Sequence, residues 1–175
     1  DMSGWSKRIW LDASNGEYPI TYPNPEGVKL WDSGNNAFLE QYNEDGTPKL
    51  FTPLCREDET EAGTAILSAQ MVMGFVFAPG NMFTGDFNYT GLSGTVNFGK
   101  PYAWTARPRA LKVRYKAQVG KIDKVGSNDP DGASYKDKQD RARIFVAVVD
   151  WTAQHGVTSG MTAPTGMWDP ATLKS

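Results

Sequence analysis

Alternation of apolar and polar residues is the main structural signal in this chain, and it predicts strands rather than helices. The segment Ala110–Val119 (ALKVRYKAQV) alternates with period two. Four further segments are also typical of strands. Thr64–Val76 has a bend near Gly74, with a short helix as the alternative, and Asn81–Asn88 is broken at Gly85. The others are Gly94–Gly99 and Ile144–Trp151, which has no polar alternation and predicts burial on both faces. Helical spacing is not sustained over three turns. The pattern therefore predicts an all-β fold.

Turn-forming residues separate these segments. The chain has 18 Gly and 11 Pro in 175 residues, and Ser14–Gly27 (SNGEYPITYPNPEG) and Trp31–Asn36 (WDSGNN) have the composition of loops. Short strands at irregular spacing, joined by long loops, indicate a two-sheet β-sandwich. The length fits one domain with its own core, so we expect a single domain over residues 1–175.

Charge is distributed unevenly along the sequence. Residues 1–99 carry 13 acids and 5 bases, a net −8, whereas residues 100–124 carry 8 bases and one acid, a net +7. The remaining residues come to −1, which gives −2 for the chain. A weakly acidic protein is not expected to bind nucleic acid.

The basic charge coincides with the alternating segment. On a strand, Leu111, Val113 and Tyr115 point to one face, and the cations between them point to the other. We expect the apolar face to pack on a second sheet and the cationic face to stay open. Three roles remain for that open face: solubility and protection from edge pairing, ion pairs with the acidic loops, or a ligand surface.

A ligand surface would combine these cations with nearby aromatic rings. Pro101 and Pro108 keep the residues between them out of a regular ladder, which predicts a loop or edge beside the cationic strand. Rings cover the apolar faces of sugars, and guanidinium groups bind carboxylate or sulfate. The predicted binding residues are Trp104, Arg107, Lys112 and Arg114, with Tyr102 and Tyr135 behind them, and the expected ligand is a glycan, acidic or sulfated sugars above all.

Signals for catalysis and for metals are weak. His155 is the only histidine, Cys55 is the only cysteine, and no Gly-x-Ser-x-Gly motif is present. Ser127–Asp137 resembles a calcium loop, but Lys138 stands where an EF-hand needs Glu, so a surface loop is favoured and structural calcium stays open. Asp86 and Asp150 adjoin predicted strands, although structural roles are favoured for both over the carboxylate pair of a glycoside hydrolase.

The order of several motifs resembles the PCMD family, whose letters stand for putative carbohydrate metabolism domain. The most specific part runs from Met82 to Lys116 and contains TGDF, FGxP, RPxAL and YK; WxxGNN precedes it and DxARIFVAVVDW follows it. The likeness covers about residues 5–160, more weakly in the first third. The family groups secreted proteins and surface lipoproteins of gut Bacteroidota.

This resemblance implies a jelly-roll-like sandwich, similar in shape to lectins and carbohydrate-binding modules, in an extracytoplasmic setting at the cell surface or in the periplasm. It implies a link to glycan use, and anchoring at an outer membrane through a lipid outside this chain. We expect non-catalytic glycan binding. The alternatives are a glycoside hydrolase or lyase on the same fold, and a structural or adhesion protein of the cell surface.

The resemblance further implies additional strands that would follow Ser175. A sandwich without them would leave an open sheet edge. We therefore expect a partial chain or, as the alternative, a protein partner or second copy that completes the sheet.

Overall fold

The computed structural model describes residues 4–12, 16–22, 30–35, 44–45, 53–72, 74–90, 93–100, 109–126, 129–142, 144, 151–160 and 164–167. The chain forms two compact units. The first comprises Asp1–Tyr102 with Asp150–Ser175, and the second comprises Ala103–Val149. The single domain over residues 1–175 stays a prediction.

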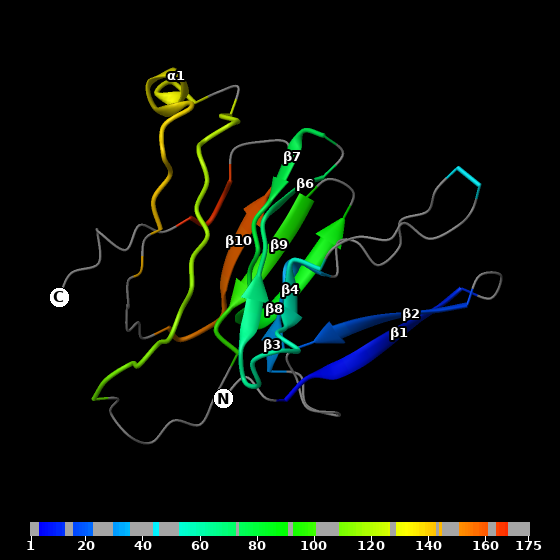
Figure 1. Ribbon diagram of the computed structural model, residues 1–175. Coiled ribbons are helices and arrows are strands. Elements are labelled where there is room, and N and C mark those ends of the chain that lie inside the picture. Colours follow the sequence, from blue (N-terminus) through cyan, green and yellow to red (C-terminus); the bar gives the residue numbers. More distant parts are fainter. Residues whose placement is uncertain are drawn as a thin grey trace. The chain divides into compact units, whose positions relative to one another are not determined.

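A four-stranded antiparallel sheet is the largest element of the first unit (Figure 1). Its strands are β3 (Trp31–Asp32), β8 (Phe83–Thr90), β9 (Ser93–Phe98) and β10 (His155–Ser159), in the order β10-β9-β8-β3. The β8–β9 hairpin matches two of the predicted strands. The sequence does not predict β10, because Gly and Thr dominate its stretch.

Three antiparallel hairpins accompany this sheet. They are β1 (Ser6–Asp12) with β2 (Gly16–Tyr22), β4 (Cys55–Glu57) with β5 (Ala65–Leu67), and β6 (Gln70–Val72) with β7 (Val76–Ala78). Together with the large sheet they confirm the predicted all-β class, consistent with a sandwich.

Two sequence expectations about these hairpins are wrong. Ser14–Gly27 contains strand β2, although Pro19 lies within it opposite Ile9. Thr64–Val76 is not one bent strand: β5 pairs back to β4, and β6 turns at Gly74 into β7. Gly74 has φ 77°, a conformation that glycine adopts without strain.

Gly85 does not break its strand, contrary to the expectation from sequence. The β8–β9 ladder is continuous from Gly85↔Phe98 to Thr90↔Ser93. Gly85 has φ 145°, and a Cβ at this position would lie 2.0 Å from the carbonyl oxygen of Asn97. Glycine is therefore the residue that lets β8 and β9 approach this closely.

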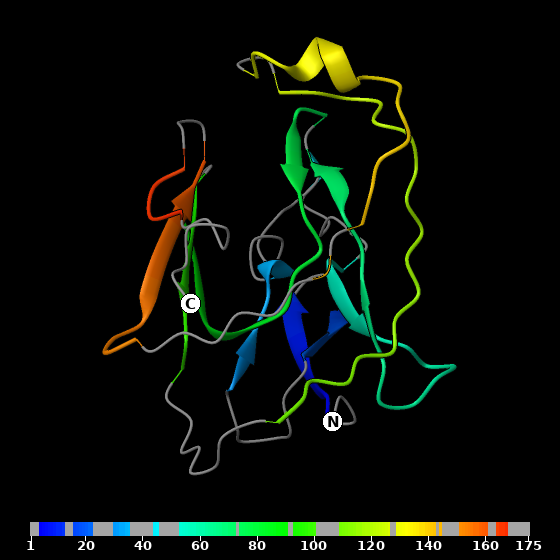
Figure 2. The ribbon, with the colours of Figure 1, turned by 90° about the vertical axis from the view of Figure 1, so that its left-hand side faces the viewer.

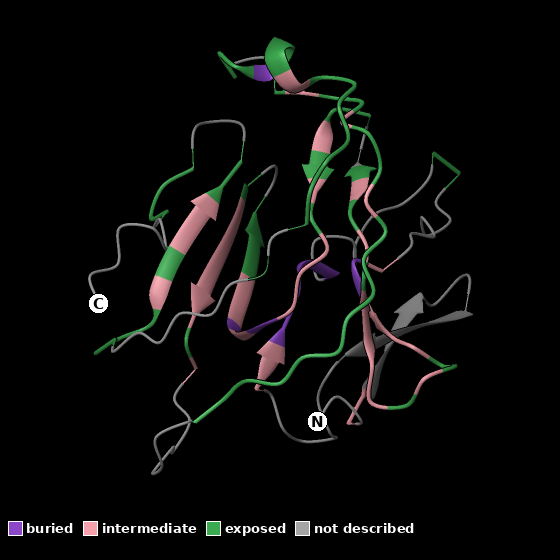
Figure 3. Ribbon diagram, turned by 60° about the vertical axis from the view of Figure 1, so that its left-hand side comes forward, coloured by how far each residue is buried: buried purple, intermediate pink, exposed green. Residues whose placement is uncertain are grey.

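Buried side chains gather where β3 ends and where β4 and β8 begin (Figure 3). Half of this set is polar: Asp32, Ser33 and Asn35 lie with Leu54, Cys55 and Phe83. Burying polar groups is tolerated when each finds a hydrogen bond. Every buried side-chain N or O atom in the described part of the chain has a partner.

Asn35 shows how these bonds hold loops to strands. Its Oδ1 accepts from the backbone N–H of Cys55 at 3.1 Å, and its Nδ2 donates to the backbone oxygen of Cys55 at 2.8 Å. The Asn35 side chain thus makes the two backbone hydrogen bonds with Cys55 that a neighbouring strand would make. Beside it, the backbone N–H of Gly34 donates to Asn81 Oδ1 at 2.7 Å.

The second unit holds a long irregular segment and the short helix α1 (Gly132–Tyr135) (Figures 1 and 2). Two antiparallel limbs meet at the bridge Lys121↔Gln139, where the backbone N–H of Ile122 donates to the carbonyl oxygen of Lys138 at 2.9 Å. α1 lies in the connection between these limbs.

The strand predicted over Ala110–Val119 is wrong. Residues 109–119, called the extended segment below, have no strand partner among the described residues and run as an open chain (Figure 2). Leu111, Val113 and Tyr115 are 66%, 56% and 65% exposed, so the expected buried face is open as well. Alternation indicates which residues would share a face if the segment were a strand. A ladder forms only where a second backbone lies alongside.

The predicted strand Ile144–Trp151 falls mostly outside the described residues. Its two described ends, Ile144 and Trp151, are exposed. Among the described residues, no helix has the length and apolar character needed to cross a membrane.

Candidate functional site

One face of the large sheet is polar along three neighbouring strands. Because alternate residues point to opposite faces, β8 places Thr84, Asp86, Asn88 and Thr90 on this side, β9 places Ser93, Thr95 and Asn97, and β10 places Gly156 and Thr158. The opposite side carries Phe83, Phe87, Val96, Phe98 and Val157. We call the first side the polar face.

Strand register sets the polar residues in rows. Asn88 lies opposite Thr95, which lies opposite Thr158, and the two threonine hydroxyls are 2.8 Å apart. In the next row Asp86 lies opposite Asn97. Asn97 lies opposite Gly156, where a Cβ would come within 3.2 Å of Asn97 Oδ1. Glycine thus leaves room for the amide on the polar face.

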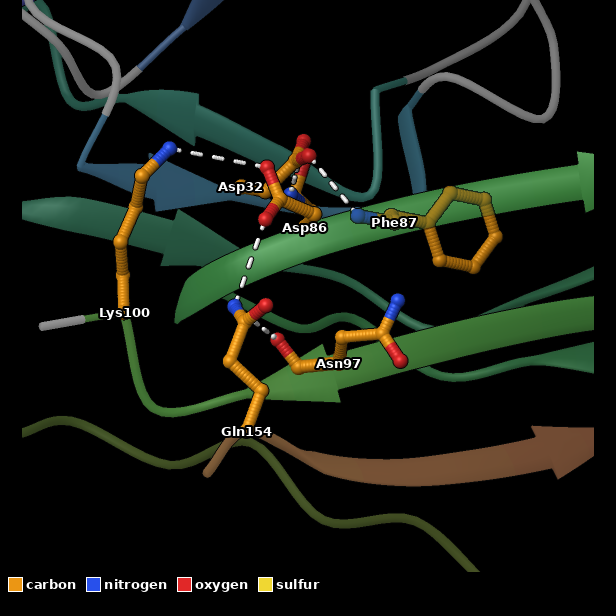
Figure 4. A network of polar contacts seen from close by, with 7 residues as sticks. Asp32, Asp86, Phe87, Asn97, Lys100 and Gln154 are labelled. Atoms are coloured by element: carbon orange, nitrogen blue, oxygen red, sulfur yellow. Dashed lines mark hydrogen bonds and ion pairs between the residues drawn. The ribbon is translucent and has the colours of Figure 1, made fainter. Parts of the chain in front are cut away.

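Asp86 is the centre of a charged and amide network at this face (Figure 4). Lys100 Nζ lies 3.6 Å from Asp86 Oδ1, and both side chains are about one-third exposed. Gln154 Nε2 donates to Asp86 Oδ2 and to the carbonyl oxygen of Asn97, each at 3.3 Å. A carboxylate, an ammonium, the side-chain amide of Gln154 and the backbone carbonyl of Asn97 therefore meet at the solvent boundary.

Asp32 overlaps Asp86 in the view of Figure 4, but it lies opposite Phe83 and therefore on the other face of the sheet. It is 1% exposed. Its Oδ1 accepts from the N–H of Ser33 and its Oδ2 from the N–H of Phe87, both at 2.9 Å. A carboxylate committed to two backbone donors in the interior does not supply the second member of a hydrolytic pair with Asp86.

His155 and Trp151 form a stacked pair, with ring centroids 5.0 Å apart and planes 28° apart. His155 lies opposite Phe98, so the alternation places it on the side away from the polar face. Its Nε2 is 2.6 Å from the carbonyl oxygen of Gly166. A carbonyl only accepts, so this nitrogen carries the proton and the ring has a structural contact.

The structure describes three of the six predicted binding residues. Tyr102, Trp104 and Arg107 lie outside the described residues. Lys112 and Arg114 are exposed on the extended segment.

Tyr135 lies in α1, half-buried, and donates its hydroxyl proton to Asp129 Oδ2.

Metal and thiol chemistry receive no support in the described residues. No group of three or more His, Cys, Asp or Glu there could hold a metal ion. In the candidate calcium loop, Asp129 Oδ1 accepts from the backbone N–H of Asp131. Burial raises the pKa of the Cys55 thiol to about 12, so it stays protonated and unreactive at neutral pH.

Sequence reasoning missed Asn97, Lys100 and Gln154. A signal for part of the polar face was present, because every second residue of Thr84–Thr90 is polar and so is every second residue of Ser93–Asn97. No local pattern singles out Gln154. It reaches the carbonyl of Asn97, 57 positions away along the chain, only because β10 pairs with β9.

Comparison with known proteins gives one family. The family model described as "Putative carbohydrate metabolism domain" matches residues 7–164. No curated protein and no solved structure shows significant similarity to the chain. The match spans most of the chain, which therefore belongs to this carbohydrate metabolism domain family.

Proposed function

We propose that this chain is a non-catalytic carbohydrate-binding domain that holds a glycan on its polar face. One observation carries the proposal: Asp86 and Gln154 meet beside the backbone carbonyl of Asn97, at the solvent boundary of a sheet face lined mainly by hydroxyls and amides. The family description is the second support.

The chemistry of the face suits sugar hydroxyls. A carboxylate accepts several hydrogen bonds, whereas an amide both donates and accepts, as a hydroxyl does. Same-face side chains repeat at about 4.8 Å across strands and about 7 Å along them. A glycan chain presents hydroxyls repeatedly along its length, so it can occupy several of these positions together.

Stacking aromatics remain part of the proposal. Tyr102 follows Lys100 by two positions in the sequence, which keeps it a candidate ring for this site. Selection of acidic or sulfated sugars by Lys112 and Arg114 stays a prediction. It was based on a strand with one buried face, and residues 109–119 do not form that strand. We also propose an extracytoplasmic setting, at the cell surface or in the periplasm.

The test is binding to a polysaccharide and glycan array, followed by affinity measurements on the best ligand with the Asp86→Ala and Gln154→Ala variants. We expect Asp86→Ala to weaken binding at least tenfold, because its carboxylate is the central acceptor and a hydrogen bond to a charged group is worth about 1.5–3 kcal/mol. The fold should persist, since an exposed ion pair such as Lys100–Asp86 contributes about 0–1 kcal/mol.

Glu59→Ala is the matched control. It removes an exposed carboxylate from the loop between β4 and β5, away from the polar face. Glycan affinity should stay within twofold of the parent protein. An equal loss in Glu59→Ala and Asp86→Ala, or unchanged affinity in Asp86→Ala, would remove the polar face as the site.

A further inference from the structure

The extended segment presents both of its faces to solvent. Leu111, Val113 and Tyr115 are more than half exposed, and Lys112, Arg114 and Lys116 between them are exposed as well. Rows of large exposed apolar side chains mark interaction surfaces more often than isolated ones do. This row belongs to the second unit, whereas the polar face lies in the first.

The odd-numbered residues define a backbone edge of the segment that is open among the described residues. In an extended chain the N–H and C=O groups of alternate residues point to opposite edges. Among the described residues, nothing hydrogen-bonds to the backbone groups of Leu111, Val113 or Tyr115. Arg114 and Lys116 have interactions of their own. The edge defined by the odd-numbered residues can therefore accept a strand.

A second copy of this chain is a poor occupant. Residues directly opposite in an antiparallel pair share a face. Any central register that sets Val113 against an apolar residue of the copy also sets Lys112 against Lys112, Arg114 or Lys116. Like charges directly opposite are destabilising. The shifted registers place cations against Leu111, Val113 and Tyr115 instead.

A strand that alternates apolar residues with Asp or Glu would match both faces of the extended segment. Apolar residues at alternate positions would cover Leu111, Val113 and Tyr115, and Asp or Glu between them would lie opposite the cations. Opposite-charge and apolar cross-strand pairs are both favourable. The surrounding residues 100–124 carry a net +7, which attracts such a segment from solution.

We propose that the extended segment is a docking edge for a partner polypeptide that adds a strand alternating apolar residues with Asp or Glu. Main-chain hydrogen bonds give affinity in this mode, and the alternate side chains give specificity. The proposal goes beyond glycan binding and uses a different part of the molecule.

The test uses the full 175-residue chain and a fluorescent synthetic peptide that alternates Val and Glu, with binding followed by anisotropy. We expect saturable binding that weakens as salt rises, because the charges are exposed. A peptide alternating Val and Lys should not bind. Polyglutamate should bind at least tenfold more weakly, since it lacks the apolar positions.

Val113→Pro tests the backbone edge. Proline removes the N–H of residue 113 from the docking edge, and the folded chain uses that group for no bond among the described residues. We expect peptide affinity to fall at least tenfold. Val113→Ala keeps the N–H and should lose less than fivefold. Ala110→Pro alters the opposite edge and should leave affinity within twofold.

Lys112→Glu tests the charge pattern. It sets a like charge against the peptide's Glu, so we expect about tenfold weaker binding and a shallower dependence on salt. Equal affinity of the parent chain for the Val–Lys peptide would overturn the proposal, as would failure of the Val–Glu peptide to bind.

A polysaccharide occupant is the remaining outcome. Polygalacturonate would then bind the parent chain, more weakly the Lys112→Glu variant, and equally well the Val113→Pro variant. Polyglutamate would bind with the same affinity as the Val–Glu peptide. Together these results would make the segment a cationic sugar surface, and the strand proposal would be wrong. Circular dichroism of each variant shows whether the fold is retained.

Discussion

At the scale of single residues, buried polar side chains organise the described core. Asn35 and Asp32 each satisfy two backbone groups, which is how their burial is compensated. The sequence marks this region only as a turn, WDSGNN, because Ser, Gly and Asn are turn residues. Their burial follows from the approach of the residues around Cys55, 20 positions away from Asn35.

Cys55 gives a prediction of pH dependence. Burial raises the pKa of its thiol from 9.0 to about 12 in the folded state. Between these values the unfolded chain loses this proton while the folded chain keeps it, so the free energy of unfolding falls as pH rises. Its contribution is fully present below about pH 9. We expect a loss of about 2 kcal/mol between pH 8.5 and 10.5 from this group.

Urea unfolding of the parent protein and of Cys55→Ala at several pH values isolates that contribution, since lysines and tyrosines titrate in both proteins. The Ala variant should begin less stable, because a small cavity replaces the sulfur. The gap should narrow as pH rises through 9–10.5. A constant gap would mean that Cys55 ionises in the folded chain as readily as in the unfolded one.

At the scale of elements, strand β3 is completed by a side chain. β3 has two residues, and the backbone N–H of Gly85 on β8 donates to the carbonyl oxygen of Leu30 at 3.2 Å. The next N–H on this edge of β8, that of Phe87, donates to the carboxylate of Asp32 instead of to a backbone carbonyl. Asp32 therefore extends the pairing of β8 beyond the end of β3.

Asp32→Asn tests this role. An amide offers one accepting oxygen where the carboxylate offers two, so one of the N–H groups of Ser33 and Phe87 would face Nδ2 rather than an acceptor. We expect a loss of about 1–3 kcal/mol in the free energy of unfolding, the usual result of leaving a buried donor unsatisfied. Chemical denaturation measures it.

Asp123→Asn makes the same chemical change at an exposed position and should alter stability by less than about 0.5 kcal/mol. Similar losses in the two variants would show that charge removal, rather than the lost acceptor at β3, is responsible.

The pairing of the elements explains which strand predictions are correct and which are wrong. Alternation predicts a strand both at Gly94–Gly99 and at Ala110–Val119, and only the first region is paired among the described residues. The β8–β9 hairpin needs only two intervening residues to bring its partners together, so its pairing is local. Residues 110–119 have no such neighbour in sequence. A strand at these residues would therefore need a partner that is distant in the sequence.

At the scale of the whole molecule, the two proposed binding functions belong to different units. The polar face lies in the first unit and the extended segment in the second. We expect a double dissociation: Asp86→Ala should weaken glycan binding and leave the Val–Glu peptide unaffected, whereas Val113→Pro should do the reverse. Calorimetry with each ligand, alone and after saturation with the other, measures both affinities.

Additive binding, with each affinity unchanged within twofold by the other ligand, is the expected result. Loss of both ligands in a single folded variant would indicate one shared surface. In that event the extended segment and the polar face would count as one site.

The sequence by itself determined the all-β class, the β8–β9 hairpin, the family and the uneven charge, because these depend on local alternation, turn residues and contiguous motifs. It also carried the polar alternation of Thr84–Thr90 and Ser93–Asn97. Only the tertiary structure decided that Gln154 meets Asp86, that Asn35 binds the backbone of Cys55, and that the residues around Val113 are open on both faces. Each depends on which distant backbones lie side by side, and a pattern in one segment does not specify its partner.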